Sequence, residues 1–111
     1  MFKLPETAQE VFDKVYNHLM TQMKRCTDEF NCLYRGKDGL KCAAGCLIPD
    51  EYYKEEMEEK GWTQLVTKEM VPSDHEKLIS DLQCVHDRAT IDKWKESLTL
   101  VATKYGLTVP N

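Results

Sequence analysis

Residues 32–50 constrain the fold of this chain more than any other stretch, because a long helix does not accommodate their glycines and their turn signal. The stretch holds three of the five cysteines and three of the five glycines of the 111-residue sequence. Its Gly36-Lys-Asp-Gly39 run predicts a tight turn, since Asp-Gly readily adopts the positive φ that a hairpin requires. We therefore expect a small β-hairpin-like excursion around residues 32–42. Small side chains then favour a short buried helix over residues 42–48, which Pro49 ends.

Amphipathic helices are predicted on both sides of this stretch. Over residues 8–23, apolar side chains recur at i, i+3, i+4 and i+7 spacing, and Thr7 and Glu10 have the spacing of a capping box. The same period runs over residues 90–105, and Gly106 is a typical helix C-cap. The two long helices therefore lie near the two ends of the chain.

Shorter elements are expected between the long helices. One helix is predicted to begin at Asp50 and end near residue 60, and another to begin at Ser73, which has capping-box spacing to Glu76. Residues 62–68 alternate only loosely, which favours an extended segment or a loop. The fold class that follows is mainly α: a compact bundle of four to five helices with the hairpin-like excursion, in one globular domain over residues 1–111.

Composition narrows the class of protein. A chain of this length can bury a core without disulfides or a metal, and 41% hydrophobic with 31% charged residues is typical of a globular protein. No apolar run approaches the ~20 residues of a membrane helix, and the N-terminus lacks the apolar core of a signal peptide. We therefore expect a cytoplasmic protein, whose cysteines serve as buried small residues, metal ligands or reactive thiols before disulfides. The net charge of −4 argues against a nucleic-acid partner.

The negative charge is concentrated in residues 50–59. This segment carries six acids against Lys54 alone, and is thus more negative than the chain as a whole. It is either a solvated helix face or an acidic docking surface for a basic partner. In the second interpretation, Tyr52 or Tyr53 supplies an aromatic anchor. The predicted partner-binding residues are Glu51, Tyr52, Glu55, Glu56, Glu58 and Glu59.

Two cysteine-based sites are possible. Cys32, Cys42 and Cys46 with Cys84 or His86 form a four-ligand set of the kind that structural zinc prefers, although the three-residue gap between Cys42 and Cys46 is less common than the usual zinc spacings. The alternative is that the small thiols fill tight core positions.

Nucleophilic catalysis is the second possibility. It requires Cys42 or Cys46 near a helix N-terminus with a lowered pKa, and His86 as base with Asp87 to orient it. Adjacent helical residues point about 100° apart, so we expect Asp87 not to orient His86. No phosphate-binding glycine loop or hydrolase motif is present. We therefore expect no catalytic residue, no enzyme activity and no cofactor.

A structural polar lock of Arg35, Asp38, His86 and Asp87 is the interpretation that we favour. Arg35 can bond a carboxylate with both guanidinium nitrogens and pin the hairpin to the helix that carries His86. A small-ligand pocket near Arg35 and His86 is a further alternative.

Two sequence blocks resemble a family of small uncharacterised proteins from tailed phages and prophage-bearing bacteria. The first block is Cys32-x-Tyr34-Arg35-Gly36-x-Asp38-Gly39-Leu-Lys-Cys42-Ala-x-Gly45-Cys46-Leu-Ile-Pro49-Asp50. The second is Leu82-Gln83-x-Val85-His86-Asp87, followed by Trp94, Leu98, Ala102 and Gly106-Leu107. With the opening helix, the blocks cover most of the chain. The resemblance implies a non-enzymatic viral accessory protein that binds and modulates a host protein, as an inhibitor of a host enzyme or defence factor, in the host cytoplasm.

Overall fold

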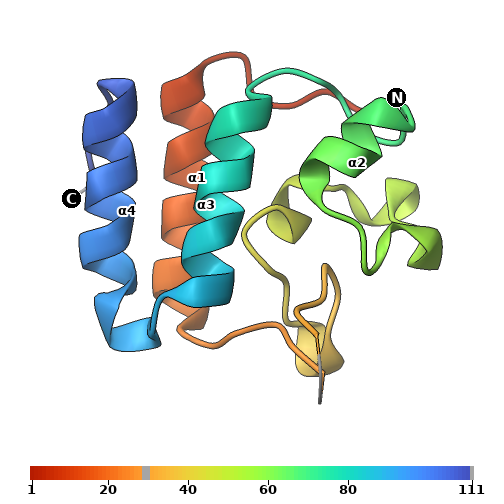
Figure 1. Cartoon of the computed structure of the whole chain (residues 1–111), viewed down its shortest axis with the longest axis horizontal. Helices are drawn as coiled ribbons and strands as arrows, with labels where there is room; N and C mark the ends of the chain where they lie inside the picture. The colour runs from red at the N-terminus through yellow and green to blue at the C-terminus, as the bar shows by residue number, and fades with distance from the viewer. Residues whose placement is uncertain (29–30, 111) are drawn as a thin grey trace.

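The computed structural model describes residues 1–28 and 31–110, and within them the protein is mainly helical, as predicted. The α-helices of this part of the chain are α1 (Ala8–Gln22), α2 (Trp62–Thr67), α3 (Glu76–Arg88) and α4 (Trp94–Tyr105). Helices α4, α1 and α3 run side by side (Figure 1), in a molecule of 33 × 31 × 19 Å. Helix α2 and the irregular segment 31–61 lie on the side of α3 away from α4, and residues 24–28 run beneath the lower end of α3 toward that side. Within the described residues, each helix falls short of the length and apolar character that crossing a membrane requires.

The ends of the long helices follow local sequence signals. The capping box at the start of α1 is formed, since the Glu10 backbone N–H donates to the Thr7 hydroxyl at 3.1 Å and the Thr7 N–H donates to the Glu10 carboxylate at 3.1 Å. Gly106 ends α4 with a φ of 68°, as predicted. The expected capping box between Ser73 and Glu76 is wrong, because α3 begins after His75, which adopts a left-handed φ of 57°.

The β-hairpin expected over residues 32–42 does not form within the described residues; a single bridge pairs Arg35 with Lys41. The reason lies in the backbone donors that a hairpin needs. The N–H groups of Tyr34 and Arg35 donate to the Glu58 carboxylate at 2.9 and 3.2 Å, and the Lys41 N–H donates to the Gln22 side chain at 3.0 Å. Side chains distant in sequence thus replace the ladder.

Short 3-10 turns replace two of the expected α-helices. The helix predicted over residues 42–48 is a turn at Gly45–Leu47. The acidic helix predicted from Asp50 is two turns, Asp50–Tyr52 and Glu55–Met57, separated by extended backbone. This segment has too thin an apolar stripe to hold an α-helix against the core, and instead buries Met57 alone as an apolar anchor from its second turn.

Residues 62–68 were expected to be extended or a loop, and this expectation is wrong. They form α2, which buries Trp62 and Leu65 at i, i+3 spacing. Its first turn is capped by the Gln64 side chain, which accepts the Gly61 N–H at 3.0 Å. The hydrophobic core lies between α1, α3 and α4 and extends under the irregular segments. The largest fully buried core side chains are Phe12 and Leu19 of α1, Ile79 and Leu82 of α3, Trp94 and Leu98 of α4, and Ile48, Met57 and Leu65 outside these helices.

Candidate functional site

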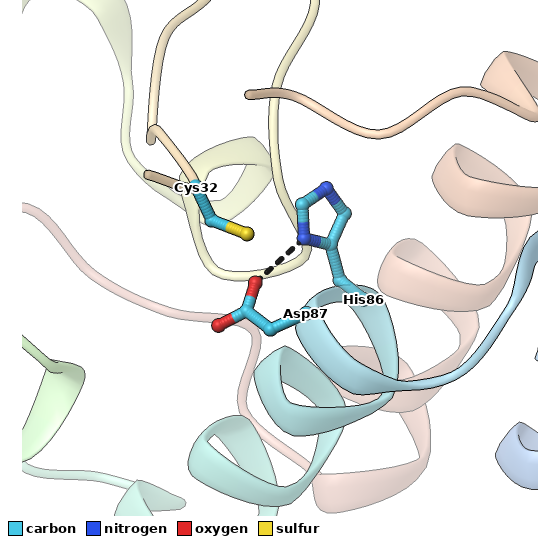
Figure 2. Close-up of side chains that lie close together, drawn as sticks. All are labelled: Cys32, His86 and Asp87. Atoms are coloured by element: carbon cyan, nitrogen blue, oxygen red, sulfur yellow. Dashed lines mark hydrogen bonds and ion pairs between the residues drawn. The ribbon is translucent and has the colours of Figure 1, made fainter. Parts of the chain in front are cut away.

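The sequence-predicted residues Cys32, His86 and Asp87 meet at the C-terminal turn of α3, and Figure 2 shows their side chains side by side. Each places one potential ligand atom within 4.8 Å of the others. His86 is fully buried, and its Nδ1 lies 2.8 Å from Asp87 Oδ1. The expectation that Asp87 cannot orient His86 is therefore wrong. Nδ1 is the ring nitrogen nearest the backbone, so the short carboxylate of the next residue reaches it.

The hydrogen bonds of the His86 ring define its tautomer. The backbone N–H of Cys26 donates to His86 Nε2 at 3.0 Å, so this nitrogen is an acceptor without a proton. The neutral ring then carries its proton on Nδ1 and donates it to Asp87. The Trp94 ring stacks on the imidazole, with ring centroids 5.7 Å apart. Both ring nitrogens are therefore occupied by partners within the chain.

Asp87 is the acceptor at the centre of this network. Gln83 Nε2 donates to Asp87 Oδ1 at 2.7 Å, and the Cys32 thiol lies within 4.8 Å of the carboxylate. Partial burial alone raises the pKa of the Asp87 carboxyl, but the hydrogen bonds from His86 and Gln83, together with the nearby Cys32 thiol, outweigh it and hold this pKa below its ordinary value. The carboxylate is thus kept ionised as the shared acceptor.

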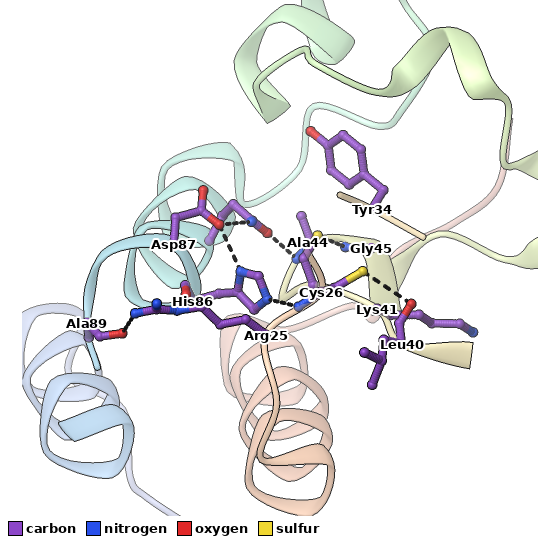
Figure 3. Close-up of polar contacts among 12 residues, drawn as sticks. Arg25, Cys26, Tyr34, Leu40, Lys41, Ala44, Gly45, His86, Asp87 and Ala89 are labelled. Carbon is purple, nitrogen blue, oxygen red and sulfur yellow. Dashed lines mark hydrogen bonds and ion pairs between the residues drawn. The ribbon is translucent and has the colours of Figure 1, made fainter. Parts of the chain in front are cut away.

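The same network fastens the irregular segments to α3 (Figure 3). The Ala44 N–H donates to Gln83 Oε1 at 2.8 Å, and the Arg25 guanidinium donates to the carbonyl oxygens of His86, at 3.1 Å, and of Ala89. The Arg25 bonds satisfy carbonyl groups that the end of α3 leaves without helical partners. Side chains of α3 therefore hold backbone atoms on two separate parts of the chain.

The cluster does not fit a metal ion in this arrangement. A metal binds the lone pair of a neutral imidazole nitrogen, and His86 has its lone pair at Nε2, where the Cys26 N–H already donates. A metal bound at Nδ1 would leave the ring proton on Nε2, where that proton would point at the Cys26 N–H, so that two donors would face each other. Of the predicted zinc ligands, the structure brings together Cys32 and His86, whereas Cys84 lies exposed on α3 and the Cys46 thiol donates to Ala43 O at 3.1 Å.

The thiols are also poorly suited to act as nucleophiles. Burial is the main cause that raises the pKa of Cys32 to about 11 and that of Cys46 to about 12, and it raises the pKa of Cys42 as well. Nucleophilic catalysis would require a lowered pKa at Cys42 or Cys46, and the pKa of each thiol is raised instead. Both ring nitrogens of His86 already bond the Cys26 N–H and Asp87, so the proton transfer that a thiol–imidazole pair with Cys32 needs has no direct route.

Arg35 acts apart from the His86 cluster. Its guanidinium donates to the carbonyl oxygens of Gly45, at 2.7 Å, and Ile48, at 2.6 Å, and forms an ion pair with Asp50 at 3.1 Å. The expected lock from Arg35 to the helix of His86 is thus replaced by a clamp on residues 45–50. Asp38 lies exposed in the turn, with a φ of 57°.

A cavity of ≈330 Å³ beside the His86 cluster is lined by Cys32, Tyr34, Cys42, Gln83, Asp87 and neighbouring residues. A small ligand there would meet Asp87 rather than Arg35.

The predicted partner-binding residues divide into two groups. Glu58 faces inward, where it accepts the backbone N–H groups of Tyr34 and Arg35 and the Tyr53 hydroxyl at 2.6 Å. Tyr52 is 40% exposed, and one side of its ring packs against Phe2 with centroids 5.4 Å apart. The other exposed members of the predicted set are Glu51, Glu55, Glu56 and Glu59.

Sequence reasoning missed Arg25 and Gln83, and it did not foresee the inward hydrogen bonds of Glu58. Gln83 stands four residues before Asp87 on one helix face, a spacing at which side chains meet, so its bond to Asp87 was open to prediction. The contacts of Arg25, and those of Glu58 with Tyr34 and Arg35, carry no local signal, because these partners lie more than 20 residues away. No protein-family model matches the chain, and comparisons with curated proteins and with solved structures also find no match.

Proposed function

We propose that this protein is a non-enzymatic, phage-type accessory protein that binds a basic surface of a bacterial host protein and modulates it. The observation that carries the proposal is an ordered acidic surface, which we define as Glu51, Glu55, Glu56 and Glu59. All four side chains are exposed. The resemblance to tailed-phage proteins supports the choice of a host protein as the partner.

The charge of the acidic surface is not compensated by ion pairs within the described residues. The ion pairs found there use other acids: Asp50, Asp81, Asp87 and Glu96. Uncompensated like charges raise the energy of the free protein, and a basic partner removes this repulsion on contact. Charge complementarity of this kind mainly accelerates encounter and selects the partner.

The backbone under the acidic surface is held in place before any partner arrives. Met57 is buried between Glu56 and Glu58, and Glu58 is bonded to two backbone N–H groups and to the Tyr53 hydroxyl. Binding to such a segment costs little ordering entropy, in contrast to binding by a disordered acidic tail. Tyr52, beside the acids, supplies a rigid aromatic contact.

The chemistry of the His86 cluster supports binding over catalysis. A catalytic histidine needs one ring nitrogen available to a substrate or to a nucleophile. His86 is fully buried and uses Nδ1 for Asp87 and Nε2 for the Cys26 amide, so its hydrogen bonds serve the fold.

The test is affinity capture from a bacterial host lysate with the tagged protein, with mass spectrometry to identify what is retained. The altered protein carries Glu51→Lys, Glu55→Lys and Glu56→Lys. Three reversed rim charges are expected to lower the retained amount of the specific partner at least about tenfold. Raising the ionic strength to about 0.5 M should weaken capture by the unaltered protein as well, since salt screens exposed charges.

The matched control reverses three exposed acids elsewhere, Glu6→Lys, Asp74→Lys and Glu96→Lys, so that the net charge of the two variants is equal. Circular dichroism confirms that both are folded. A host protein retained by the unaltered chain and the control but lost from the acidic-surface variant supports the proposal. Equal retention by all three proteins, or no stoichiometric host protein at all, refutes it.

A further inference from the structure

A groove between α3 and α4 remains outside the proposed function. It has a volume of ≈470 Å³, and its apolar lining comes from Val85 of α3, Ala89 just after α3, and Leu100 and Val101 of α4. Helix α1 packs against both α3 and α4, and Leu82 and Leu98, which lie outside the groove, are fully buried. The pair α3–α4 is therefore covered by α1 and has a second, uncovered apolar face.

The residues on the uncovered face follow one helical stripe on each helix. Helix α3 presents Asp81, Cys84, Val85 and Arg88, and α4 presents Ser97, Leu100, Val101 and Lys104. Both sets have i, i+3, i+4, i+7 spacing, which is the pattern of a helix face that packs against another helix. Leu100 is 68% exposed, and unlike a scattered surface leucine it borders an apolar groove.

We propose that a second copy of this chain occupies the groove, in a two-fold dimer with each α3 antiparallel to its partner. The axis passes between Cys84 and Val85. Asp81, whose Oδ2 already accepts from Lys104 and from the Tyr105 hydroxyl, then lies opposite the partner's Arg88 with Oδ1 left to accept from that guanidinium, and the same contact repeats with the two copies exchanged. An isologous interface requires such self-complementarity, because every contact occurs twice.

The neighbouring helix is in register with the same axis. Lys104 bonds Asp81 at 2.9 Å, which places these two residues at one level of the antiparallel helix pair. Counting inward from that level, Leu100 and Val101 stand beside Cys84 and Val85. A single axis therefore brings the apolar centres of both helices against those of the partner, and Lys104 lies opposite the partner's Ser97 rather than a like charge.

The size of the face places the proposed dimer among the small interfaces. Helix α3 has 13 residues, so at 1.5 Å per residue the face is about 20 Å long, and two adjacent helices are about 20 Å wide. Pairing two such faces buries on the order of 1,000 Å² in total, the lower end for a specific interface. We therefore expect a dimer that dissociates on dilution to micromolar concentration.

The first measurement is the mass in solution by sedimentation equilibrium over about 1–500 μM protein, a range that brackets a weak interface of this size. The mass is expected to rise from 12.9 kDa to twice that value. Leu100→Lys should weaken association at least tenfold, whereas the control Leu100→Met should not. Arg88→Glu should weaken it, and adding Asp81→Arg to Arg88→Glu should restore it. A monomer at every concentration overturns the proposal and leaves the groove to a different protein.

The second measurement tests the register with a natural cysteine. All five cysteines lie in the described residues, and Cys84 is the one classed as exposed. Each Cys84 stands one position from the proposed axis, so a short bismaleimide should join the two copies through Cys84, and Cys84→Ser should abolish this product. A dimer that does not cross-link through Cys84 overturns the antiparallel α3 pairing, because α3 would then lie against the partner's α4.

Discussion

Replacing His86 with leucine is expected to destabilise the fold by about 2–4 kcal/mol, even though leucine is apolar and of similar size. The ring is fully buried, so the substitution keeps most of the apolar contact with Trp94 and creates little empty space. What it removes is the acceptor of the Cys26 N–H and the donor to Asp87.

The two lost hydrogen bonds differ in cost. The Cys26 amide belongs to a fully buried residue, and leaving such a group without a partner costs roughly 1–3 kcal/mol. The Asp87 side chain is 35% exposed, so water replaces part of the missing donor and the loss is nearer 1 kcal/mol. The orphaned amide therefore contributes more than the weakened carboxylate.

The assay is urea unfolding followed by circular dichroism. With a slope of about 1–3 kcal/mol per molar urea, the midpoint should fall by roughly 1–2 M. His75→Asn is the matched control, because asparagine tolerates the left-handed conformation at that position, and it should change stability by less than about 0.5 kcal/mol. Nitrogen-15 spectra of unaltered protein should show the proton of the His86 ring on Nδ1.

The reasoning fails if His86→Leu costs no more than the His75 control, or if the proton resides on Nε2. A double-mutant cycle with Asp87→Asn makes the test stricter. Because His86 and Asp87 share a hydrogen bond, their separate costs should exceed the cost of the double substitution by about 0.5–2 kcal/mol. Additive costs would show that the pair is not coupled.

Three further outcomes are expected. Gly45→Ala should lower the free energy of unfolding, measured thermally, by about 1–3 kcal/mol, because a Cβ there would lie 2.4 Å from a backbone carbonyl oxygen. In the control Gly61→Ala the added Cβ meets open space, so this change should be nearly neutral. Equal costs for the two substitutions would contradict the close approach at Gly45. Burial lowers the pKa of His18 from its ordinary 6.5, so as the pH falls the unfolded chain takes up this proton before the folded chain does. The free energy of unfolding should therefore decrease as the pH drops below about 6.5. The substitution His18→Gln should remove this pH dependence, and an unchanged dependence would assign it to another group. A thiol reagent at neutral pH should label Cys84 rapidly and Cys42, which is buried with a raised pKa, only on unfolding; fast labelling of the latter would contradict its burial.

The helices with sustained apolar period were predictable, and the irregular segments were not. Helices α1 and α4 follow from local spacing and caps, which is why their ends at Thr7 and Gly106 agree with the sequence. The hairpin was wrong because its backbone donors bond to Gln22 and Glu58, which lie about 20 residues away on either side. Turn chemistry alone does not reveal such distant competition.

The candidate site shows the same division. His86 and Asp87 are neighbours in sequence, and their bond was dismissed on helical geometry although the ring nitrogen nearest the backbone is within reach. The state of His86 depends on the amide of Cys26, 60 residues away, and no residue pattern predicts which backbone N–H a buried ring will meet. The juxtaposition with Cys32 likewise arises only when the irregular segment crosses α3.

The way in which the irregular segments are held has a consequence for how their sequence can drift. Gln83 and His86 hold amide groups, Arg35 holds carbonyl groups, and Glu58 holds two further amides. Main-chain atoms are common to almost all residue types, so many substitutions along the irregular segments leave these hydrogen bonds unchanged. A change in the length of a segment, in contrast, displaces all the main-chain N–H and C=O groups that these side chains bond. A library scan should therefore tolerate replacement of exposed residues such as Lys37 and reject single-residue insertions beside them.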